Sequence, residues 1–301
     1  MKKAAIEMGT NSTRLLISEI NNNKIKSLKK ELITTRLGEG VDKNRILNES
    51  AIERGLNALK IFKEQIKDYE VKDVRLVGTS ALRDVKNGAQ FQKLVKENIG
   101  YNLEIISGKK EAELIFKGVT YSYDLDDYII IDIGGGSTEF IWKSPAVEKV
   151  KMDSLNLGAV RLTERFIENP EQKINEQVVN KIAEFVKKEI QTEVAKLPTI
   201  ENLIGVGGTI TTMATILLKA EKYSSKAVHD YILNFIDVDN ILEKLRKLPI
   251  KERKQVKGLN PDRADIIVAG VIILKEIMKS LNTKQLRVSD NDILEGLLIE
   301  A

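Results

Sequence analysis

Short apolar runs that end at polar, glycine-containing turns give the first elements of the chain. Residues 4–8 and 15–20 are two such runs, separated by the turn from Gly9 to Ser12, and this spacing predicts two strands joined by a tight turn. The same layout returns in residues 128–142, where the turn runs from Gly134 to Thr138. We interpret the two copies as an internal duplication, which predicts two similar domains that face one another.

Other segments repeat their apolar residues every three to four positions, as one face of a helix does. On this basis helices are predicted over residues 50–69, 174–197 and 263–280, and two more helices are expected over residues 110–119 and 210–219. Further strands are predicted over residues 74–77, 103–106 and 202–206. The alternation of strands and helices predicts an α/β fold with mixed sheets.

The composition limits which side chains can serve in catalysis or metal binding. The chain has 301 residues, of which 42% are apolar and 31% charged, and this is typical of a globular protein with two cores. It has no cysteine, which excludes disulfides, thiolate metal sites and cysteine nucleophiles, and its one histidine, His229, excludes a histidine cluster. Acid–base chemistry is therefore left to carboxylates, and we expect His229 to be a surface or packing residue.

Charge and hydropathy bear on location and partners. The formal net charge of +4 is small, and the charges are interspersed without a basic tail, which disfavours nucleic acid as a partner. The longest apolar window, residues 266–274, is too short to span a bilayer, and Glu7 interrupts the N-terminal apolar stretch that a targeting signal would need. We therefore expect a cytoplasmic protein with no membrane partner.

A third glycine turn, from Gly205 to Thr209, follows a predicted strand and opens a predicted helix. In all three turns glycine lets the main chain approach an anion closely, and clustered N–H groups with neighbouring hydroxyls can bind phosphate oxygens. The helix N-terminus adds a partial positive charge to the third turn. A single glycine turn after a strand is an ordinary structural feature, so it is the occurrence of three in one chain that favours phosphate binding.

Carboxylates adjoin these turns. Asp132 ends a near-continuous apolar strand just before the triple glycine, and Glu139 follows Thr138. We interpret Asp132 as a ligand for Mg²⁺, because a carboxylate in an apolar strand is costly without a partner; the alternative is that Asp132 caps the turn and Glu139 faces solvent. Glu111 falls in the first turn of the helix predicted from residue 110, where it is either a catalytic carboxylate or a favourable partner of the helix dipole.

Several longer motifs follow one another in a fixed order, and together they resemble the exopolyphosphatase/guanosine pentaphosphate phosphohydrolase (Ppx/GppA) family. They are residues 5–16 (AIEMGTNSTRLL), 35–40 (TRLGEG), 79–84 (TSALRD), 107–108 with 111–112 (SG and EA), 131–139 (IDIGGGSTE), 156–161 (NLGAVR), 205–209 (GVGGT) and 263–267 (RADII). The resemblance spans nearly the whole chain.

This resemblance implies an α/β fold of two actin-like (ASKHA, ribonuclease H-like) domains with a substrate cleft between them. We assign residues 1–115 to the first domain and 116–301 to the second, within a boundary region at 112–127, and expect no further HD-type domain. The resemblance also implies release of terminal orthophosphate from polyphosphate or guanosine pentaphosphate (pppGpp) by in-line attack of water. Mg²⁺ is the implied cofactor, with Mn²⁺ as an alternative, and the implied assembly is a homodimer.

The family's site residues carry over by position. Glu111 matches the general base, and Asp132, Glu139 and Glu7 match acids that hold the metal. The phosphate-binding positions are Gly9, Thr10, Asn11, Ser12, Arg14, Gly134, Gly135, Gly136, Ser137, Thr138, Gly207, Gly208, Thr209 and Arg263. Two segments depart from the family pattern: members usually carry an aspartate where this chain has Glu7, and residues 290–296 lack the glycine and arginine of an Asp-x-Gly-x-Arg-Glu-Gly motif.

Two other functions fit the same residues. Actin-like folds also host phosphotransferases and ATPases such as sugar kinases, although the sequence shows neither an acceptor site nor an adenosine pocket. The second alternative is a non-catalytic protein that binds the alarmone guanosine tetraphosphate. Glu7 and the altered motif at 290–296 are the features that keep this alternative open.

Overall fold

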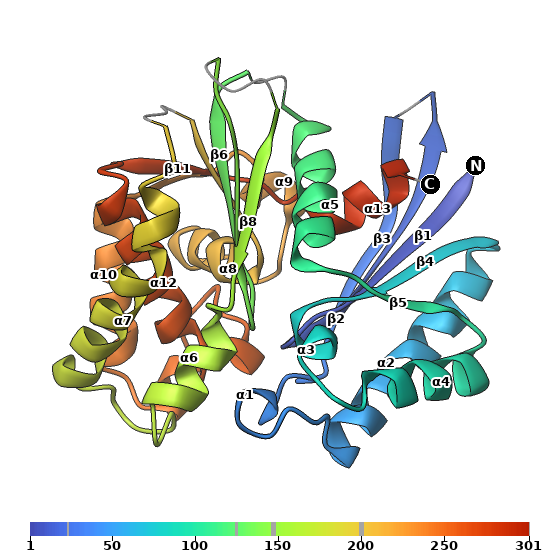
Figure 1. Ribbon diagram of the computed structural model, residues 1–301, viewed down its shortest axis with the longest axis horizontal. Coiled ribbons are helices and arrows are strands. Elements are labelled where there is room, and N and C mark those ends of the chain that lie inside the picture. Colours follow the sequence, from blue (N-terminus) through green and yellow to red (C-terminus); the bar gives the residue numbers. More distant parts are fainter. Residues whose placement is uncertain (23, 124–125, 146–148, 199–201, 301) are drawn as a thin grey trace. The chain divides into compact units, whose positions relative to one another are not determined.

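The computed structural model describes residues 1–22, 24–123, 126–145, 149–198 and 202–300. The chain folds into two compact units (Figure 1). Unit 1 contains Met1–Tyr123 and Asn291–Ala301, and unit 2 contains Asp124–Asp290. This division differs from the ranges 1–115 and 116–301 that we assigned from the sequence, because the last residues of the chain pack with the N-terminal ones.

Unit 1 is built on a five-stranded sheet in the order β3-β2-β1-β4-β5. Its strands are β1 (Lys2–Met8), β2 (Ser12–Asn21), β3 (Lys24–Thr34), β4 (Asp73–Gly78) and β5 (Leu103–Ile105). The first three strands pair antiparallel, and β4 and β5 are added parallel to β1. β1 lies between β2 and β4, so both of its edges are paired and its residues 3–8 are all buried.

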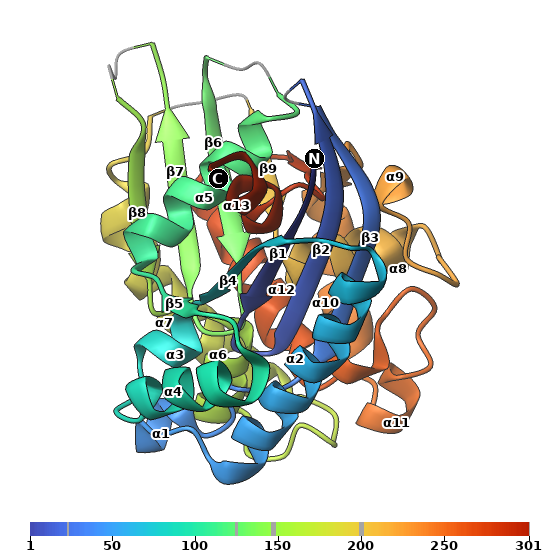
Figure 2. The same cartoon turned by 90° about the vertical axis from the view of Figure 1, so that its right-hand side faces the viewer.

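Helices pack on both faces of this sheet. They are α1 (Val41–Asn44), α2 (Glu49–Asp68), α3 (Ser80–Arg83), α4 (Gly88–Ile99), α5 (Gly108–Thr120) and α13 (Ile293–Glu300). Ile6 and Met8 of β1 share one apolar cluster with Phe62 of α2 and Phe91 of α4. Because side chains alternate along a strand, Glu7 points to the other face, where α13 contacts β1 and α5. Figure 2 shows α13 beside α5 and away from α2 and α4.

The contact between α5 and α13 depends on two glycines. A Cβ atom added at Gly118 of α5 would overlap the main-chain carbonyl of Asp292, and one added at Gly296 of α13 would overlap the carbonyl of Leu114. Each helix therefore presents a glycine to the backbone of the other, which allows a very close approach. This packing is the reason that residues 291–301 belong to unit 1 and not to the second domain.

Unit 2 is built on a six-stranded sheet in the order β10-β11-β9-β6-β7-β8. Its strands are β6 (Tyr128–Ile133), β7 (Thr138–Lys143), β8 (Lys151–Leu155), β9 (Leu203–Val206), β10 (Ile232–Asn234) and β11 (Gln285–Val288). β6, β7 and β8 pair antiparallel, β9 runs parallel to β6, and β11 runs parallel to β9. β10 closes the far edge in the antiparallel sense.

The core of unit 2 is formed around one apolar helix. The helices are α6 (Ala159–Phe166), α7 (Glu176–Val194), α8 (Gly208–Leu217), α9 (Ser225–Val228), α10 (Phe235–Arg246), α11 (Ile250–Arg253), the 3-10 helix η1 (Pro261–Arg263) and α12 (Ile267–Ser280). α12 is buried over most of its length and contacts α6, α7, α8 and α10. Even so, within the described part of the chain no helix combines the length and the apolar character needed to cross a bilayer.

The internal duplication predicted from the two glycine hairpins is confirmed by the topology. Each sheet contains three antiparallel strands followed by parallel additions, so that β1 to β5 correspond to β6 to β9 and β11. The α/β fold with mixed sheets is likewise confirmed. The helices predicted over residues 50–69, 110–119 and 210–219 are present as α2, α5 and α8 with ends shifted by one or two residues.

The helix predicted over residues 263–280 is wrong at its start. Asn260 accepts a hydrogen bond from the Asp262 N–H, and Pro261 begins a short 3-10 turn. The buried guanidinium of Arg253 then donates to the Ala264 carbonyl over 2.8 Å, and α12 begins only at Ile267. Arg263 therefore lies in the turn before the helix.

Candidate active site

The first glycine turn, from Gly9 to Ser12, is held from behind by main-chain hydrogen bonds. The Gly9 N–H donates to the Ser12 carbonyl over 2.9 Å and closes the turn. The carbonyls of Thr10 and Asn11 accept from the N–H groups of Gly38 and Arg36, both at 2.8 Å. In a planar trans peptide the N–H points opposite to the carbonyl. The N–H groups of Asn11 and Ser12 are therefore turned away from residues 36–38, as an anion site requires.

The second turn, from Gly134 to Thr138, repeats this arrangement. Gly134 N–H donates to the Ser137 carbonyl over 3.0 Å, and the carbonyls of Gly134 and Gly135 accept from the first N–H groups of α6 at 3.0 and 2.8 Å. The Arg161 Nε donates to the third carbonyl, that of Gly136, over 2.9 Å. By the same peptide geometry the N–H groups of Gly135, Gly136 and Ser137 are turned away from α6.

The third turn joins β9 to α8. Gly207 has a φ of 87°, which a residue with a side chain rarely adopts, and a Cβ atom there would overlap a carboxylate oxygen of Asp132. A Cβ atom at Gly208 would overlap the guanidinium of Arg263. The Thr209 side chain lies against Gly270 of α12. Asp132 and Arg263 thus meet at the N-terminus of α8.

The two hairpins differ in the charged pair that stands beside each turn. Glu7 of β1 lies directly across from Arg14 of β2, whereas Asp132 of β6 lies across from Glu139 of β7. Residues opposite one another on antiparallel strands share a face of the sheet. The first hairpin therefore contains an acidic and a basic residue, whereas the second contains two buried acids. Of these two, Glu139 accepts a hydrogen bond from the Ser154 hydroxyl at 2.8 Å.

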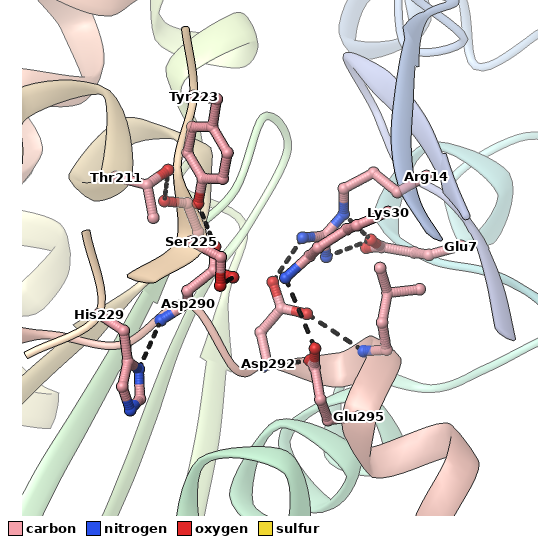
Figure 3. Close-up of polar contacts among 12 residues, drawn as sticks. Glu7, Arg14, Lys30, Thr211, Tyr223, Ser225, His229, Asp290, Asp292 and Glu295 are labelled. Carbon is pink, nitrogen blue, oxygen red and sulfur yellow. Dashed lines mark hydrogen bonds and ion pairs between the residues drawn. The ribbon is translucent and has the colours of Figure 1, made fainter. Parts of the chain in front are cut away.

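Arg14 is held between two carboxylates (Figure 3). Its Nε donates to Glu7 over 2.7 Å and its Nη1 pairs with Asp292, which lies just before α13. Burial would lower the pKa of Arg14, but the two carboxylates raise it well above its ordinary value. Burial would also raise the pKa of Asp292, but Arg14 and Lys30 hold it below the usual range. The two charges are therefore both retained in the folded protein.

Glu111 lies in the first turn of α5, as the sequence predicted. Ser107 caps the helix by accepting from the Lys110 N–H over 3.2 Å, and the Glu111 carboxylate accepts from the Arg83 Nη1 over 2.9 Å. Burial, with a smaller contribution from the nearby charge of Glu7, raises the pKa of Glu111 to about 7 against the opposing effect of Arg83. Near neutral pH this carboxylate can both accept and release a proton.

The residues that we predicted as ligands or catalytic groups gather in two sets. Unit 1 brings Glu111 within electrostatic range of Glu7 and Arg14, beside the first turn. Unit 2 brings Asp132, Glu139 and Arg263 to the second and third turns. The individual roles of these residues in catalysis, metal binding and phosphate binding stay predictions.

The donor chemistry of unit 2 suits Mg²⁺ better than that of unit 1. Among the residues that the structure describes, no three acidic or histidine side chains cluster as a complete metal cage. Mg²⁺ does not require one, since it commonly keeps several waters and takes one or two carboxylates together with substrate phosphates. The opposed pair Asp132 and Glu139 fits that donor set. The Oε2 of Glu7, by contrast, accepts from Arg14, which competes with a metal for this oxygen.

Comparison with known proteins now places the chain. The family model described as the Ppx/GppA phosphatase family matches residues 16–301. The chain belongs to the Ppx/GppA phosphatase family. Exopolyphosphatase 2 of Mycobacterium tuberculosis is 31% identical, with 98% of this chain and 97% of that protein covered. The guanosine-5'-triphosphate,3'-diphosphate pyrophosphatase of Vibrio cholerae is 27% identical, with 99% of this chain and 58% of that protein covered.

One relative carries a name with two activities. The bifunctional 3-dehydroquinate synthase/phosphatase of Fusobacterium nucleatum is 38% identical over 99% of this chain, and this chain spans 46% of that relative's length. Among solved structures, the Ppx/GppA member of Aquifex aeolicus matches with a TM-score of 0.81 at 31% identity, covering 100% of this chain and 97% of that one. An exopolyphosphatase from Cytophaga hutchinsonii matches with a TM-score of 0.90 at 28% identity, covering 99% and 96%. Units 1 and 2 accordingly have the actin-like fold of the Ppx/GppA family.

Two residues of the site were missed by sequence reasoning. Arg83 lies inside a motif that resembles the Ppx/GppA family, but a lone arginine gives no sign that it reaches a carboxylate 28 positions away. Asp292 did carry a signal. It accepts from the Leu294 N–H over 3.1 Å, and its own N–H donates to Glu295 over 2.9 Å, so the spacing Asp-x-x-Glu is a helix capping box.

The one histidine is a packing residue in unit 2, as expected. Its Nδ1 accepts from the Asp290 N–H over 3.2 Å, and the Asp290 carboxylate accepts from the hydroxyls of Ser225 and Tyr223 (Figure 3). These contacts anchor the chain just before residues 291–301, which belong to unit 1. His229 therefore fixes the course of the main chain.

Proposed function

We propose that the chain hydrolyses a terminal phosphoanhydride bond and releases orthophosphate from inorganic polyphosphate or guanosine pentaphosphate. Membership of the Ppx/GppA phosphatase family supports hydrolysis, and the names of its relatives support these two substrate classes. The observation that carries the proposal is Glu111, a buried carboxylate whose pKa is raised to about 7. A base with this pKa is matched to deprotonating water near neutral pH.

Glu111 acts as the general base in this proposal. Arg83 donates to its Oε2 and fixes the orientation of the carboxylate, so we assign Oε1 to the attacking water. The water oxygen forms a bond to the terminal phosphorus while the bond from that phosphorus to the bridging oxygen breaks. The proton of the water passes to Glu111, and the negative charge left on the bridging oxygen remains with the shortened substrate.

Each glycine turn offers a binding site for phosphate oxygens within its own unit. The N–H groups of Asn11, Ser12, Gly135 and Gly136 are turned away from the segments that hold their turns, and each can donate to a phosphate oxygen. Arg263 at the third turn adds a guanidinium that is suited to gripping phosphate with two hydrogen bonds. Arg14 is a weaker candidate for this role, because it already pairs with Glu7 and Asp292.

Asp132 and Glu139 would hold Mg²⁺, or Mn²⁺ as the alternative. When bound, the metal neutralises charge on the phosphate oxygens as the anhydride bond breaks. Two buried acids directly across from one another also repel, and a divalent cation would relieve this repulsion.

The experiment that tests the proposed function measures orthophosphate release from polyphosphate and from guanosine pentaphosphate side by side, with and without Mg²⁺. We expect release from at least one substrate, dependent on the metal and nearly abolished in Glu111→Gln. Absence of release from both substrates, together with tight binding of guanosine tetraphosphate, would show a non-catalytic sensor instead. Transfer of phosphate from ATP to an acceptor, rather than to water, would show a phosphotransferase.

A further inference from the structure

Behind the first glycine turn lies a second arginine that touches none of the predicted site residues. We propose that Arg54 is a positioning residue, which holds the main chain at Thr35 and Arg36 so that the turn from Gly9 to Ser12 keeps its N–H groups directed at phosphate. This inference rests on the proposed function, since it assumes that the turn from Gly9 to Ser12 is an anion site.

Arg54 lies in α2, and all three guanidinium nitrogens form hydrogen bonds with other residues of unit 1. Its Nε donates to the Thr35 carbonyl over 2.8 Å, and its Nη2 donates to the Arg36 carbonyl over 3.3 Å. The Nη2 also pairs with Glu39 at 2.7 Å, and the Nη1 donates to the Ser50 hydroxyl at 3.2 Å. The Glu39 carboxylate and the Ser50 hydroxyl fix the plane of the guanidinium. The guanidinium in turn holds the two carbonyls, and with them the main chain, in place.

A single peptide group connects Arg54 to the turn. The carbonyl of Thr35 accepts from Arg54, and the N–H of the same peptide, which belongs to Arg36, donates to the Asn11 carbonyl over 2.8 Å. The peptide that contains the Asn11 carbonyl ends in the N–H of Ser12. A positive charge thus lies at one end of a chain of two peptide groups, and the N–H of Ser12 lies at the other. Hydrogen bonds in such a chain polarise one another in the same direction.

The segment under Arg54 has a conformation that must be held in place. Arg36 has a φ of 49°, in the left-handed region that residues with a side chain rarely adopt. At Gly38 a Cβ atom would overlap the methyl group of Thr10, so the segment presses directly against the turn. Movement of residues 35–38 would therefore move Thr10 and Asn11.

The adjacent glycine explains how α2 comes close enough. A Cβ atom added at Gly55 would lie 3.0 Å from Leu37 and 3.4 Å from Met8, so α2 approaches this segment closely next to Arg54. The second hairpin offers a parallel within unit 2, where the Arg161 guanidinium donates to the Gly136 carbonyl. In both hairpins a guanidinium lies on the carbonyl side of the turn, directly in the second and one peptide removed in the first.

Arg54→Lys should retain only part of the positioning effect of Arg54. The guanidinium is a planar fork that can hold two carbonyls and a carboxylate in fixed directions, whereas an ammonium is a point charge on a flexible stem. Arg54→Lys keeps the charge and loses the fork, and Arg54→Ala loses both. Lys60→Ala is the matched control, because Lys60 is an exposed cation on the same helix.

The test compares wild type, Arg54→Ala, Arg54→Lys and Lys60→Ala in two measurements. The first is the Kd of pyrophosphate, the shortest phosphoanhydride, by calorimetry, with KM and kcat for polyphosphate alongside. We expect Arg54→Ala to raise the Kd and the KM by ~10-fold, the worth of about one good hydrogen bond to a charged group, with a smaller change in kcat. Arg54→Lys should fall between wild type and Arg54→Ala, and Lys60→Ala should match wild type.

The second measurement is amide hydrogen exchange at Arg36 and Gly38, the N–H groups that hold the turn. Exchange should accelerate in Arg54→Ala and not in Lys60→Ala. A variant that loses thermal stability while Kd, KM and these exchange rates stay at wild-type values would overturn the proposal in favour of a purely structural role. If wild type releases no phosphate from any substrate, the proposed function fails, but pyrophosphate binding and amide exchange still decide the role of Arg54.

Discussion

Arg83 donates to the carboxylate of Glu111 across 2.9 Å, and yet the pKa of Glu111 is raised to about 7. A guanidinium at this distance favours the charged carboxylate, so the pKa rises only because burial opposes the charge more strongly. Glu7 adds repulsion from the same side of the sheet. Arg83 therefore moderates the shift, and it keeps the pKa of Glu111 in the range where proton transfer to and from water is easy.

This pKa predicts the pH dependence of activity. A general base works in its deprotonated form, so kcat/KM of the wild type should fall about tenfold per pH unit below a midpoint near 7. Glu111→Gln should lose several orders of magnitude in kcat and should show no such acidic limb, while retaining its fold and its affinity for phosphate. Rates measured from pH 5 to pH 9 check this. An acidic limb that persists unchanged in Glu111→Gln would assign it to another group.

The same shift predicts a pH-dependent cost in stability. The pKa of Glu111 is higher in the folded protein, at about 7, than its ordinary value of 4.5, so the folded state binds the proton more tightly. The free energy of unfolding should therefore be unaffected below pH 4.5, decrease between pH 4.5 and 7, and level off above. Glutamine keeps an acceptor for Arg83 without the charge. At pH 8 we expect Glu111→Gln to be more stable than wild type by on the order of 1–3 kcal/mol.

Urea unfolding at pH 5 and pH 8 measures this difference. The gain should be present at pH 8 and small at pH 5, where the wild-type carboxyl is mostly protonated. Glu113→Gln is the control, because Glu113 is a half-exposed glutamate two positions further along α5, and it should change stability equally at both pH values. A gain of the same size at both pH values would mean that the desolvated charge of Glu111 is not its source.

The sequence located the parts of the site that depend on local pattern. Apolar runs on either side of the turns at Gly9 and Gly134 predicted both hairpins, and the short run from Ser107 to Glu111 placed Glu111 in the first turn of α5. Each of these features is decided by residues within a few positions of one another. Local geometry and short-range hydrogen bonds therefore suffice to predict them.

Features that depend on tertiary contacts were not predicted. Nothing in the sequence around Arg54 distinguishes it from the exposed cations on the rest of α2, and its role emerges only from the carbonyls of residues 35 and 36. The return of residues 291–301 to unit 1 depends on Gly118 and Gly296, which lie far apart in the sequence. β3 was missed because it is a half-exposed edge strand rich in lysine, without a clear alternation of apolar residues.

The opposed acids of the second hairpin predict a metal requirement that resides in unit 2. Asp132→Asn and Glu139→Gln each remove one of the two charges and preserve the side-chain shape, so the turn at Gly134 should remain intact. Each should raise the Mg²⁺ concentration for half-maximal activity by at least ~10-fold, since Mg²⁺ takes few protein ligands and depends on each of them. Activity measured against Mg²⁺ concentration checks this. Glu7→Gln serves as the comparison, and a metal dependence altered there but not in the unit 2 variants would assign the metal to the first hairpin.

Asp292 combines two roles that substitution can separate. Asparagine is as good a helix cap as aspartate, so Asp292→Asn should lose the ion pair with Arg14 and keep the cap of α13, whereas Asp292→Ala loses both. We expect Asp292→Asn to lower the free energy of unfolding by about 1–3 kcal/mol, less than a fully orphaned buried charge costs, because Glu7 still pairs with Arg14. Asp292→Ala should lose about 1 kcal/mol more.

The pKa of Asp292 lies below its ordinary value of 3.8, so the stabilisation by its charge is fully present above pH 3.8 and disappears as the pH falls through the lower folded value. Wild type and Asp292→Asn should therefore converge in strong acid, while the further loss in Asp292→Ala should persist. Equal stabilities of wild type and Asp292→Asn at pH 7 would mean that the close pairing of Arg14 with Glu7 alone sustains this part of unit 1.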